Sequence, residues 1–517
     1  MLQYNKPKKV SKIGLISCTS NFFNFGLRSI EAYLKNLGHE VFIINSVTKE
    51  DNPISLLNSF QLKTLAERCF DCDVVGSSII SAHNLKRAEQ VNNYLLENTK
   101  AKVILGGVPV ILDPHYFLKF ADYVCLGEGE VFFEKFLQSE DYSTVPGLGY
   151  KAGNGEVVLN SLPPLVNINN LPIPRFDFAK TYLLTEDKIT SLAEDPKPLY
   201  VCCSRGYRIF STRGCSFSCT YCANNKLNSI YAESGKIIRS IHPDKVIEEL
   251  EYAKEIIPNL HQVYIIDDDF AARPKDEFEY LISEYQKKIN LPCTFYSKWQ
   301  TLTEAKLDII LKYKLKVVWL KLGLQSASLR MNKYYYKRPF NKKLFIEKCR
   351  LIISNNINLR LDMIFQNPYE SVPDWIENLS FFRELGQGIA LDRSSPKLIL
   401  LNQFSLRFYP GTELYDRALN DGMIDRNYVN DVLLIRNKYN VGKMSMYSIN
   451  MFSIDIVLLS LYYLLMANKA NLLCRIFRSP FVLKFINWLC SNSLFKFCYS
   501  RFRLHSVFSK IKRRFLG

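Results

Sequence analysis

The chain has 517 residues, of which 48% are hydrophobic and 23% are charged. This balance is typical of a folded protein of about three domains, and it excludes collagen, a coiled coil and a largely disordered chain. The formal net charge of +17 is unevenly distributed, because residues 451–517 contain eleven basic side chains and one acidic side chain. A basic end of this kind can contact the phosphates of a nucleic acid or of an anionic membrane.

The beginning of the sequence carries no recognisable targeting segment. Residues 1–12 are polar and basic, and the apolar stretch at 13–17 is much shorter than the core of a signal peptide. We therefore expect a cytoplasmic protein whose 14 cysteines are reduced and serve as metal ligands or core residues. The best candidate for a membrane span, residues 456–468, is shorter than the ~20 residues that cross a bilayer.

Residues 1–140 alternate short apolar strands with helical segments, which predicts a parallel sheet covered by helices on both faces. We expect strands at 13–17, 41–45, 74–79, 103–105 and 123–125, and helices at 27–37, 56–69, 85–97, 114–120 and 130–137. This is a Rossmann-like, flavodoxin-like α/β domain, whose ligand lies at the carboxyl ends of the strands. The loops at these ends contain the candidate ligand-binding residues Ser77, Ser78, Gly106, Gly107, Gly127, Glu128 and Gly129.

Three further regions follow this domain. Residues 141–199 are rich in proline and predict a linker with a hairpin at 149–160. Residues 200–440 repeat a strand-helix pattern with strands expected at 209–212, 263–266, 294–298, 317–322, 359–365 and 398–404, which predicts a partial (β/α)6 TIM barrel. Residues 441–517 show no strand pattern, so we expect a helical C-terminal extension.

The motif that carries the chemistry is Cys215-x3-Cys219-x2-Cys222, directly after the first predicted strand of the barrel. Three soft thiolates on one loop suit an iron-sulfur cluster, and three ligands for four irons leave one iron open to another molecule. A structural zinc site would require a fourth protein ligand, for which His242 is the nearest histidine downstream. The spacing alone leaves this alternative open.

With Tyr221 before its last cysteine, this loop resembles the cluster loop of the radical S-adenosylmethionine (SAM) superfamily. The resemblance implies a [4Fe-4S] cluster held by Cys215, Cys219 and Cys222, whose open iron binds SAM. Cleavage of SAM then gives a 5′-deoxyadenosyl radical, which removes a hydrogen atom from an unactivated carbon. It also implies an electron donor such as flavodoxin or ferredoxin.

Other positions are assigned to SAM by the same resemblance. Asp267 and Asp268 follow the second strand of the barrel, where an aspartate could accept the ammonium group of SAM; alternatively this acidic run stabilises a helix N-terminus. Gln325 and Ser326 end the fourth strand, where relatives commonly carry glutamate. The segment 365–370 departs from the glycine-containing loop of relatives, whereas 409–412 matches its counterpart, which is equally a plain turn.

Segments 25–40, 105–109 and 122–130 resemble the cobalamin-binding domain that precedes many radical SAM domains, in the arrangement called class B. Residues 18–26 contain no histidine, so the axial ligand that some of these domains give to cobalamin is missing. His39 is expected on the opposite edge of the sheet, in a solvated position. Alternatively, the domain is an empty scaffold, because a sheet alone does not prove a ligand.

We therefore expect a radical SAM enzyme that uses cobalamin to methylate or rearrange an unactivated carbon of a small-molecule or lipid-like substrate. One alternative is a methylthiotransferase acting on RNA, which would require a second cluster on Cys18, Cys69 and Cys72, residues expected at opposite edges of the sheet. Others are a ring-forming or oxidative radical SAM enzyme without bound cobalamin, and a non-catalytic iron-sulfur sensor.

The end of the chain suggests where the protein works. Apolar side chains recur at helical spacing between residues 504 and 515, with Lys510, Lys512, Arg513 and Arg514 filling the other side. Such a helix packs on the barrel or lies on an anionic bilayer, and nucleic acid is a less favoured partner. Contact with the inner face of the membrane would fit a lipid or polyprenoid substrate.

Overall fold

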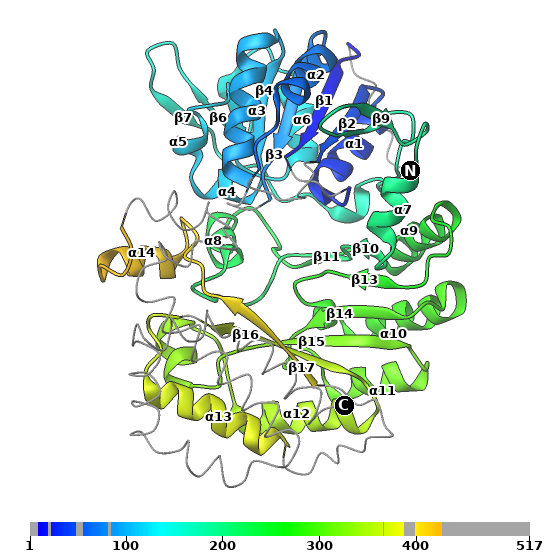
Figure 1. Ribbon diagram of the computed structural model, residues 1–517, viewed down its shortest axis with the longest axis vertical. Coiled ribbons are helices and arrows are strands. Elements are labelled where there is room, and N and C mark those ends of the chain that lie inside the picture. Colours follow the sequence, from blue (N-terminus) through cyan, green and yellow to red (C-terminus); the bar gives the residue numbers. More distant parts are fainter. Residues whose placement is uncertain are drawn as a thin grey trace, which may run out of the picture. The chain divides into compact units, whose positions relative to one another are not determined.

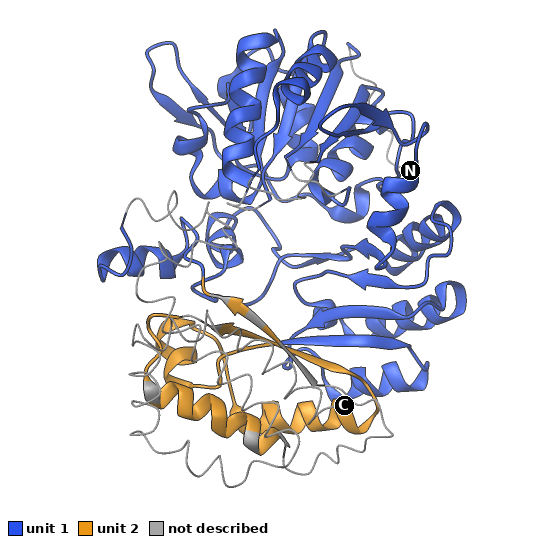
Figure 2. Ribbon diagram, in the orientation of Figure 1, with its two compact units in different colours: residues 1–322, 407–436 blue, residues 323–406, 437–517 orange. Residues whose placement is uncertain are grey.

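The computed structural model describes residues 9–18, 22–47, 55–80, 84–365, 367–386 and 399–425, in which strands and helices alternate (Figure 1). The chain divides into two compact units (Figure 2). Unit 1 comprises Met1–Leu322 and Arg407–Arg436, and unit 2 comprises Gly323–Leu406 and Asn437–Gly517. This division differs from the domain boundaries predicted at 140, 199 and 440, because the first sheet and the beginning of the barrel fall in the same unit.

The first sheet of unit 1 is flavodoxin-like, as predicted. Its central strands are parallel and lie in the order β5-β4-β3-β1-β2, which is the flavodoxin-like order read from the opposite edge. These strands are β1 (Lys12–Ser17), β2 (Glu40–Ser46), β3 (Val74–Ser78), β4 (Lys102–Gly106) and β5 (Tyr123–Cys125).

Helices cover both faces of this sheet, and each face has its own apolar core. On one face, Leu65 of α2, Val91 of α3 and Phe117 of α5 pack with inward residues of the strands. On the other face, Leu34 of α1 and Phe132 of α6 form a second core. The helices are α1 (Phe25–Leu37), α2 (Ser59–Cys69), α3 (Leu85–Asn98), α4 (Val108–Leu112), α5 (Pro114–Phe117) and α6 (Gly129–Gln138).

The region predicted as a linker contributes strands to both edges of the first sheet. The expected hairpin forms from β6 (Leu148–Lys151) and β7 (Val157–Leu159), and it pairs antiparallel with β5. At the other edge, β8 (Thr181–Leu184) pairs parallel with β2, and β9 (Ile189–Ser191) follows it. Among the described residues, the sheet therefore has nine strands. The second pair of strands was not expected, because each is too short to show a periodic pattern.

The second strand-helix series begins in unit 1. Four of its strands are parallel neighbours: β10 (Tyr207–Ile209), β13 (Val263–Ile265), β14 (Cys293–Ser297) and β15 (Val317–Gln325), the last of which continues into unit 2. The strand expected at 209–212 is interrupted, because β11 (Thr212–Arg213) turns away to pair antiparallel with β12 (Arg239–Ser240). The helices of this part are α7 (Lys197–Cys203), α8 (Ala223–Ile230), α9 (Pro243–Ile256), α10 (Lys275–Glu284), α11 (Glu304–Lys312) and α14 (Glu413–Asn420).

Unit 2 continues the series with α12 (Lys342–Ser354), β16 (Leu359–Phe365), α13 (Val372–Gly386) and β17 (Ile399–Ser405). Strands β16 and β17 are parallel, with Asp362 beside Asn402, whose amide donates to the Asp362 carboxylate at 2.6 Å. The element order is the one predicted for a partial (β/α)6 barrel.

Within the described residues, no helix is long and apolar enough to cross a membrane. The candidate span at 456–468 and the basic amphipathic helix expected at 504–515 lie outside the part of the chain that the structure describes.

Gly107 follows β4 with a φ of 112°, and a Cβ there would lie 2.1 Å from the carbonyl oxygen of Ile79. Gly107→Ala is therefore expected to lower the free energy of unfolding by about 2–4 kcal/mol, since it combines a disfavoured backbone conformation with a clash against backbone. Urea unfolding of the apo protein measures this change. Gly153→Ala is the matched control, because nothing lies within 4 Å of its Cβ position; equal losses in both variants would contradict the prediction.

Candidate functional site

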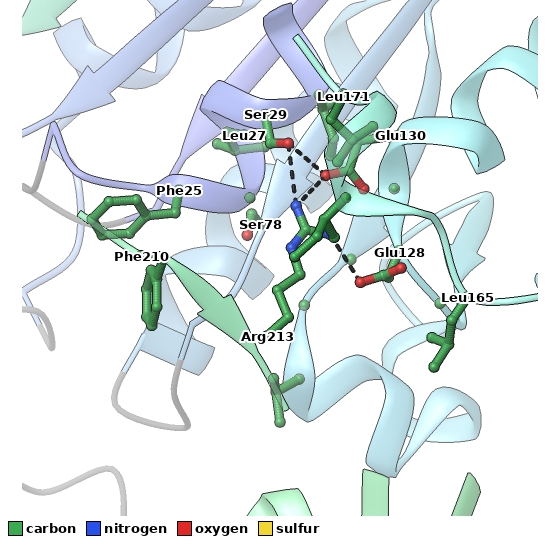
Figure 3. A pocket seen from close by; sticks show the side chains of 18 of the residues that line it. Phe25, Leu27, Ser29, Ser78, Glu128, Glu130, Leu165, Leu171, Phe210 and Arg213 are labelled. Carbon is green, nitrogen blue, oxygen red and sulfur yellow. Dashed lines mark hydrogen bonds and ion pairs between the residues drawn. The ribbon is translucent and has the colours of Figure 1, made fainter. Parts of the chain in front are cut away.

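A cavity of about 430 Å³ lies in unit 1 at the carboxyl edge of the first sheet (Figure 3). On one side it is lined by every residue that the sequence predicted at this rim: Ser77, Ser78, Gly106, Gly107, Gly127, Glu128 and Gly129. On the other side it is lined by Thr212, Arg213 and Gly214, which lead into the cysteine loop, and by Asp268. The predicted rim and the residues that directly precede the cysteine loop thus line the same cavity.

Two side chains of the rim are already engaged by the protein. The Ser77 hydroxyl donates to Oδ1 of Asn92 at 2.7 Å. The Cys125 thiol donates to the carbonyl of Gly127 at 3.5 Å, and burial raises its pKa to about 12, so it remains a neutral thiol. The remaining rim positions named above are mostly glycines, which leave the backbone open to a ligand.

Glu128 connects the rim to the strands around the cysteine loop. Its carboxylate accepts hydrogen bonds from Arg213 at 2.8 Å, from both Nη atoms of Arg239 at 2.8 Å, and from the backbone N–H of Val166 at 3.0 Å. Figure 3 shows Arg213 reaching Glu128 on one side and Glu130 on the other.

Glu130 completes this network. It accepts from Arg213 at 2.6 Å and from the hydroxyl of Ser29 at 2.6 Å.

Burial raises the pKa of Glu128, but hydrogen bonds and charge from Arg239 and Arg213 outweigh it and hold the pKa at about 2. The Glu128 carboxylate is therefore ionised at every physiological pH. Charge-assisted hydrogen bonds join the loop after β5 to strands β11 and β12.

The three aspartates after β13 have three different environments. Asp267 is 1% exposed and accepts from the backbone and hydroxyl of Ser211 and from the backbone of Thr212, at 2.5–3.0 Å. Asp269 accepts from Ser297 at the end of β14 and from Lys298 and Thr301 in the turn that follows. Asp267 was expected to face SAM, but its carboxylate instead fixes the strand that leads into the cysteine loop.

Asp268 is the member of this run that lines the cavity. Burial raises its pKa, while the charge of Lys298 and a hydrogen bond with Asn224 lower it. Asn224 also lines the cavity, on α8 directly after Cys222, so Asp268 lies beside the end of the cysteine loop.

The cysteine loop is held at several points. Gly214 has a φ of 93°, and a Cβ there would lie 2.3 Å from the carbonyl oxygen of Ile237, so only glycine fits before Cys215. Asn228 of α8 donates to the Cys215 carbonyl at 2.8 Å. The backbone N–H of Leu414, at the start of α14, donates to the Thr220 carbonyl at 3.0 Å.

The three cysteines have the chemistry that an iron-sulfur cluster requires. Cys215 and Cys219 are buried, Cys222 and Tyr221 are half-buried, and the Cys222 pKa is raised to about 11 by burial together with the nearby Cys219 and Cys215. Within the described residues, no three Cys, His, Asp or Glu side chains are gathered tightly enough to hold a metal ion. Neutral thiols do not attract one another, so their convergence depends on the metal itself.

Lys298 is a residue of this site that the sequence analysis missed. Its ammonium group lies 2.5 Å from the Cys215 sulfur and 4.0 Å from the centre of the Phe217 ring, and the side chain is 7% exposed. A cation at the carboxyl end of a barrel strand was the available signal, because ligands of such barrels bind at these ends.

Two family models match the sequence. The B12 binding domain matches residues 11–137, and the Radical SAM superfamily matches residues 209–381. The chain joins a B12-binding domain to a radical SAM domain. The resemblances stated from the cysteine loop and from the rim segments are therefore confirmed.

Solved structures of similar fold include two enzymes of this kind. The chain is 17% identical to the cobalamin-dependent S-adenosylmethionine radical enzyme OxsB, with a TM-score of 0.59 over 80% of this chain and 56% of that chain. It is 14% identical to the radical S-adenosylmethionine methyltransferase TsrM from Kitasatospora setae, with a TM-score of 0.61 over 80% of this chain and 76% of that chain. The chain thus spans little more than half of OxsB, and identities this low show a shared fold alone. No curated protein matches the sequence.

The two domains define the cofactors. A radical SAM domain uses a [4Fe-4S] cluster and SAM, and the B12-binding domain takes cobalamin. Radical SAM enzymes also draw electrons from a reductant such as flavodoxin or ferredoxin. The glycine-lined cavity of the B12-binding domain and the thiol loop of the radical SAM domain both have the chemistry to receive these groups.

Two predicted SAM contacts, Gln325 and Ser326, lie in unit 2. Gln325, at the end of β15, has a φ of 64°, a conformation that non-glycine residues seldom adopt. Ser326 is fully buried, and its hydroxyl has two acceptors within reach, Oδ1 of Asn378 at 3.3 Å and Oε1 of Glu370 at 3.4 Å. The Ser326 hydroxyl therefore secures the segment after β15.

The alternative metal sites find no support in the described residues. His242 caps α9 and is 59% exposed beside Asp244, so it serves as a helix cap, and no zinc group includes it. Cys69, the last residue of α2, and Cys72 are buried neighbours, and Cys18 belongs to no three-residue metal group with them. A second cluster on these three cysteines, as in a methylthiotransferase, is therefore not favoured.

Removing the shared carboxylate should destabilise the B12-binding domain. Glu128→Gln leaves the guanidinium group of Arg239 without its anion and that of Arg213 with Glu130 alone, and we expect a loss of about 3 kcal/mol in the free energy of unfolding at pH 7. Because the folded pKa of about 2 lies below the ordinary 4.5, the stabilisation is complete above pH 4.5 and disappears as the pH falls toward 2.

Urea unfolding of wild type and Glu128→Gln between pH 7 and pH 2.5 tests both statements. Glu248→Gln is the control, since Glu248 is 56% exposed in its pair with Arg175 and should contribute less than about 1 kcal/mol. A gap between wild type and Glu128→Gln that stays constant down to pH 2.5 would refute the role of this ionisation.

Proposed function

We propose that the protein methylates an unactivated carbon of a small molecule, with SAM as radical source and methyl donor and cobalamin as methyl carrier. The observation that carries this proposal is the cavity in unit 1. It is bounded on one side by the B12-binding rim and on the other by Thr212, Arg213 and Gly214, which lead into the cysteine loop. A methyl carrier in this cavity would lie beside the loop that holds the radical source.

Cys215, Cys219 and Cys222 are the proposed cluster ligands. With the cluster and SAM bound, the site supplies one-electron cleavage of SAM and a radical that activates a carbon–hydrogen bond. The chain's own residues position these groups. Asp267 fixes the strand before the loop, Asn228 and the N–H of Leu414 hold its backbone, and Gly214 permits its close turn.

The rim residues are the proposed cobalamin contacts. Ser78 and the glycines at 106, 107, 127 and 129 present a surface with few side chains, which lets a large planar ligand approach the backbone. Glu128 holds this rim against Arg213 and Arg239, so the ligand would meet a pre-organised wall. Asp268 and Asn224 are the polar groups proposed to face SAM.

The nature of the substrate remains a further proposal. The structures of TsrM include one with tryptophan and a SAM analogue bound, which shows that a small aromatic molecule is a substrate in that protein. A lipid or polyprenoid substrate is suggested here only by the basic residues between 504 and 515. Peripheral contact with the inner face of the membrane would accompany such a substrate.

Reciprocal loss of the two cofactors is the decisive test. The full chain is reconstituted anaerobically with iron, sulfide and hydroxocobalamin, and iron, bound corrinoid and 5′-deoxyadenosine are measured. Cys215→Ala should abolish 5′-deoxyadenosine formation and retain the corrinoid. Gly106→Leu should lose the corrinoid and retain the cluster, because a Cβ at Gly106 meets only Cys125, at 3.6 Å, and the longer side chain fills the cavity.

Cys293→Ala is the matched control for the thiol, since Cys293 is a buried core residue of β14. It should keep full iron content and activity. Two clusters per chain with modified RNA would instead indicate a methylthiotransferase, and SAM binding without cleavage would indicate a sensor. Iron-free wild type would remove the whole proposal.

Membrane contact has its own test. The full chain should pellet with vesicles of anionic phospholipid at moderate salt and not with vesicles of zwitterionic lipid, because basic side chains near a membrane contribute through the negative surface potential. Charge reversal at Lys510, Lys512, Arg513 and Arg514 should abolish pelleting. Failure of the wild type to pellet removes the membrane and lipid-substrate proposals together.

A further inference from the structure

One buried lysine touches the cysteine loop from outside it. Lys298 follows β14, 83 residues after Cys215, and its Nζ lies 2.5 Å from the Cys215 sulfur. The same ammonium group lies 4.0 Å from the ring centre of Phe217, which belongs to the cysteine loop. The ammonium group of Lys298 therefore contacts two parts of the loop, the sulfur of Cys215 and the ring of Phe217.

The turn that carries Lys298 is fixed by Asp269. The Asp269 carboxylate accepts from the hydroxyl of Ser297 at 3.0 Å, from the backbone N–H of Lys298 at 3.2 Å, and from the hydroxyl of Thr301 at 2.8 Å. The Lys298 carbonyl in turn accepts from the backbone N–H of Leu302 at 3.0 Å. The backbone N–H and carbonyl of Lys298 are thus both hydrogen-bonded, and its side chain extends from this fixed turn to the cysteine loop.

The burial of Lys298 strengthens the electrostatic interactions of its ammonium group with nearby atoms. Its side chain is 7% exposed, so little water screens its charge. The cation–π contact with Phe217 stabilises the ammonium in this position, and such a contact is stronger where the pair is desolvated. The charge is therefore held at the sulfur of a proposed cluster ligand.

We infer that Lys298 is a positioning and tuning residue, which donates a hydrogen bond to the Cys215 thiolate and makes the cluster easier to reduce. Hydrogen bonds to cluster sulfurs and nearby charge set the reduction potentials of such clusters. A donor and a positive charge beside one thiolate stabilise the reduced, more negative cluster relative to the oxidised one. The inference rests on the proposed cluster ligands and adds to them a determinant of the first electron transfer.

The test is the midpoint potential of the cluster, measured by a redox titration monitored by electron paramagnetic resonance in the absence of SAM. Lys298→Gln should lower the equilibrium constant for reduction about tenfold, which is a shift of about 59 mV to a more negative potential for one electron. Lys298→Arg keeps the charge and the donors and should restore a potential close to that of the wild type.

Lys306 offers a matched control. It is another buried lysine of unit 1, 8% exposed, but its Nζ donates to the carbonyls of Ala271 and Arg273 at 2.6 and 2.7 Å. Lys306→Gln should lower stability and leave the potential unchanged. An equal shift in both variants would show a general effect of losing a buried lysine, and it would overturn the inference.

A second measurement needs no variant. Wild-type protein labelled with ¹⁵N only at the lysine side-chain nitrogen should show a weak ¹⁵N coupling in the pulsed resonance spectrum of the reduced cluster. Absence of this coupling overturns the inference even if Lys298→Gln fails to fold.

Two outcomes separate the inference from the proposed function. If Lys298→Gln keeps the wild-type potential and only binds SAM more weakly, Lys298 serves SAM and the inference is wrong while the cluster assignment stands. If wild-type protein takes up no [4Fe-4S] cluster at all, the proposed function itself fails.

Discussion

One largely buried carboxylate, that of Glu128, is shared by two guanidinium groups, and the junction between two parts of unit 1 depends on it. Glu128 belongs to the loop after β5, whereas Arg213 and Arg239 belong to the paired strands β11 and β12 beside the cysteine loop. A carboxylate in this environment is stable only while its partners stay within hydrogen-bond distance, since an unpaired buried charge is strongly destabilising. The loop after β5 and the strands beside the cysteine loop are therefore joined through one carboxylate.

The acidic run after β13 shows how neighbouring residues of one type divide the work of a site. Asp267 fixes the backbone before the cysteine loop, and Asp269 fixes the turn after β14, so each secures a different approach to the same loop. Asp268, between them in sequence, points to the cavity. Two of the three carboxylates thus build the frame, and one is left to meet a ligand.

The sequence was sufficient for the features that follow from local pattern. Alternating strands and helices predicted the flavodoxin-like sheet, and the rule that ligands lie at the carboxyl edge predicted the rim that lines the cavity. The cysteine loop predicted the radical SAM domain through its resemblance to the cluster loop of that superfamily. Contacts between distant segments could not be predicted in this way: Lys298 reaches Cys215 across 83 residues, and Arg213 reaches Glu128 across 85. The three aspartates were also indistinguishable by sequence, because their roles depend on which strand lies opposite each one.

Residues 141–199 add strands to both edges of the first sheet. These strands determine which fragment of the protein could fold independently. A fragment ending near residue 140 would leave β2 and β5 with unpaired backbone groups along their outer sides, which are templates for intermolecular strand addition. Such a truncation would favour aggregation over an independently soluble module. The proline-rich segment thus supplies both edges of the sheet, and a fragment of the chain has to extend beyond β9 to keep the sheet complete.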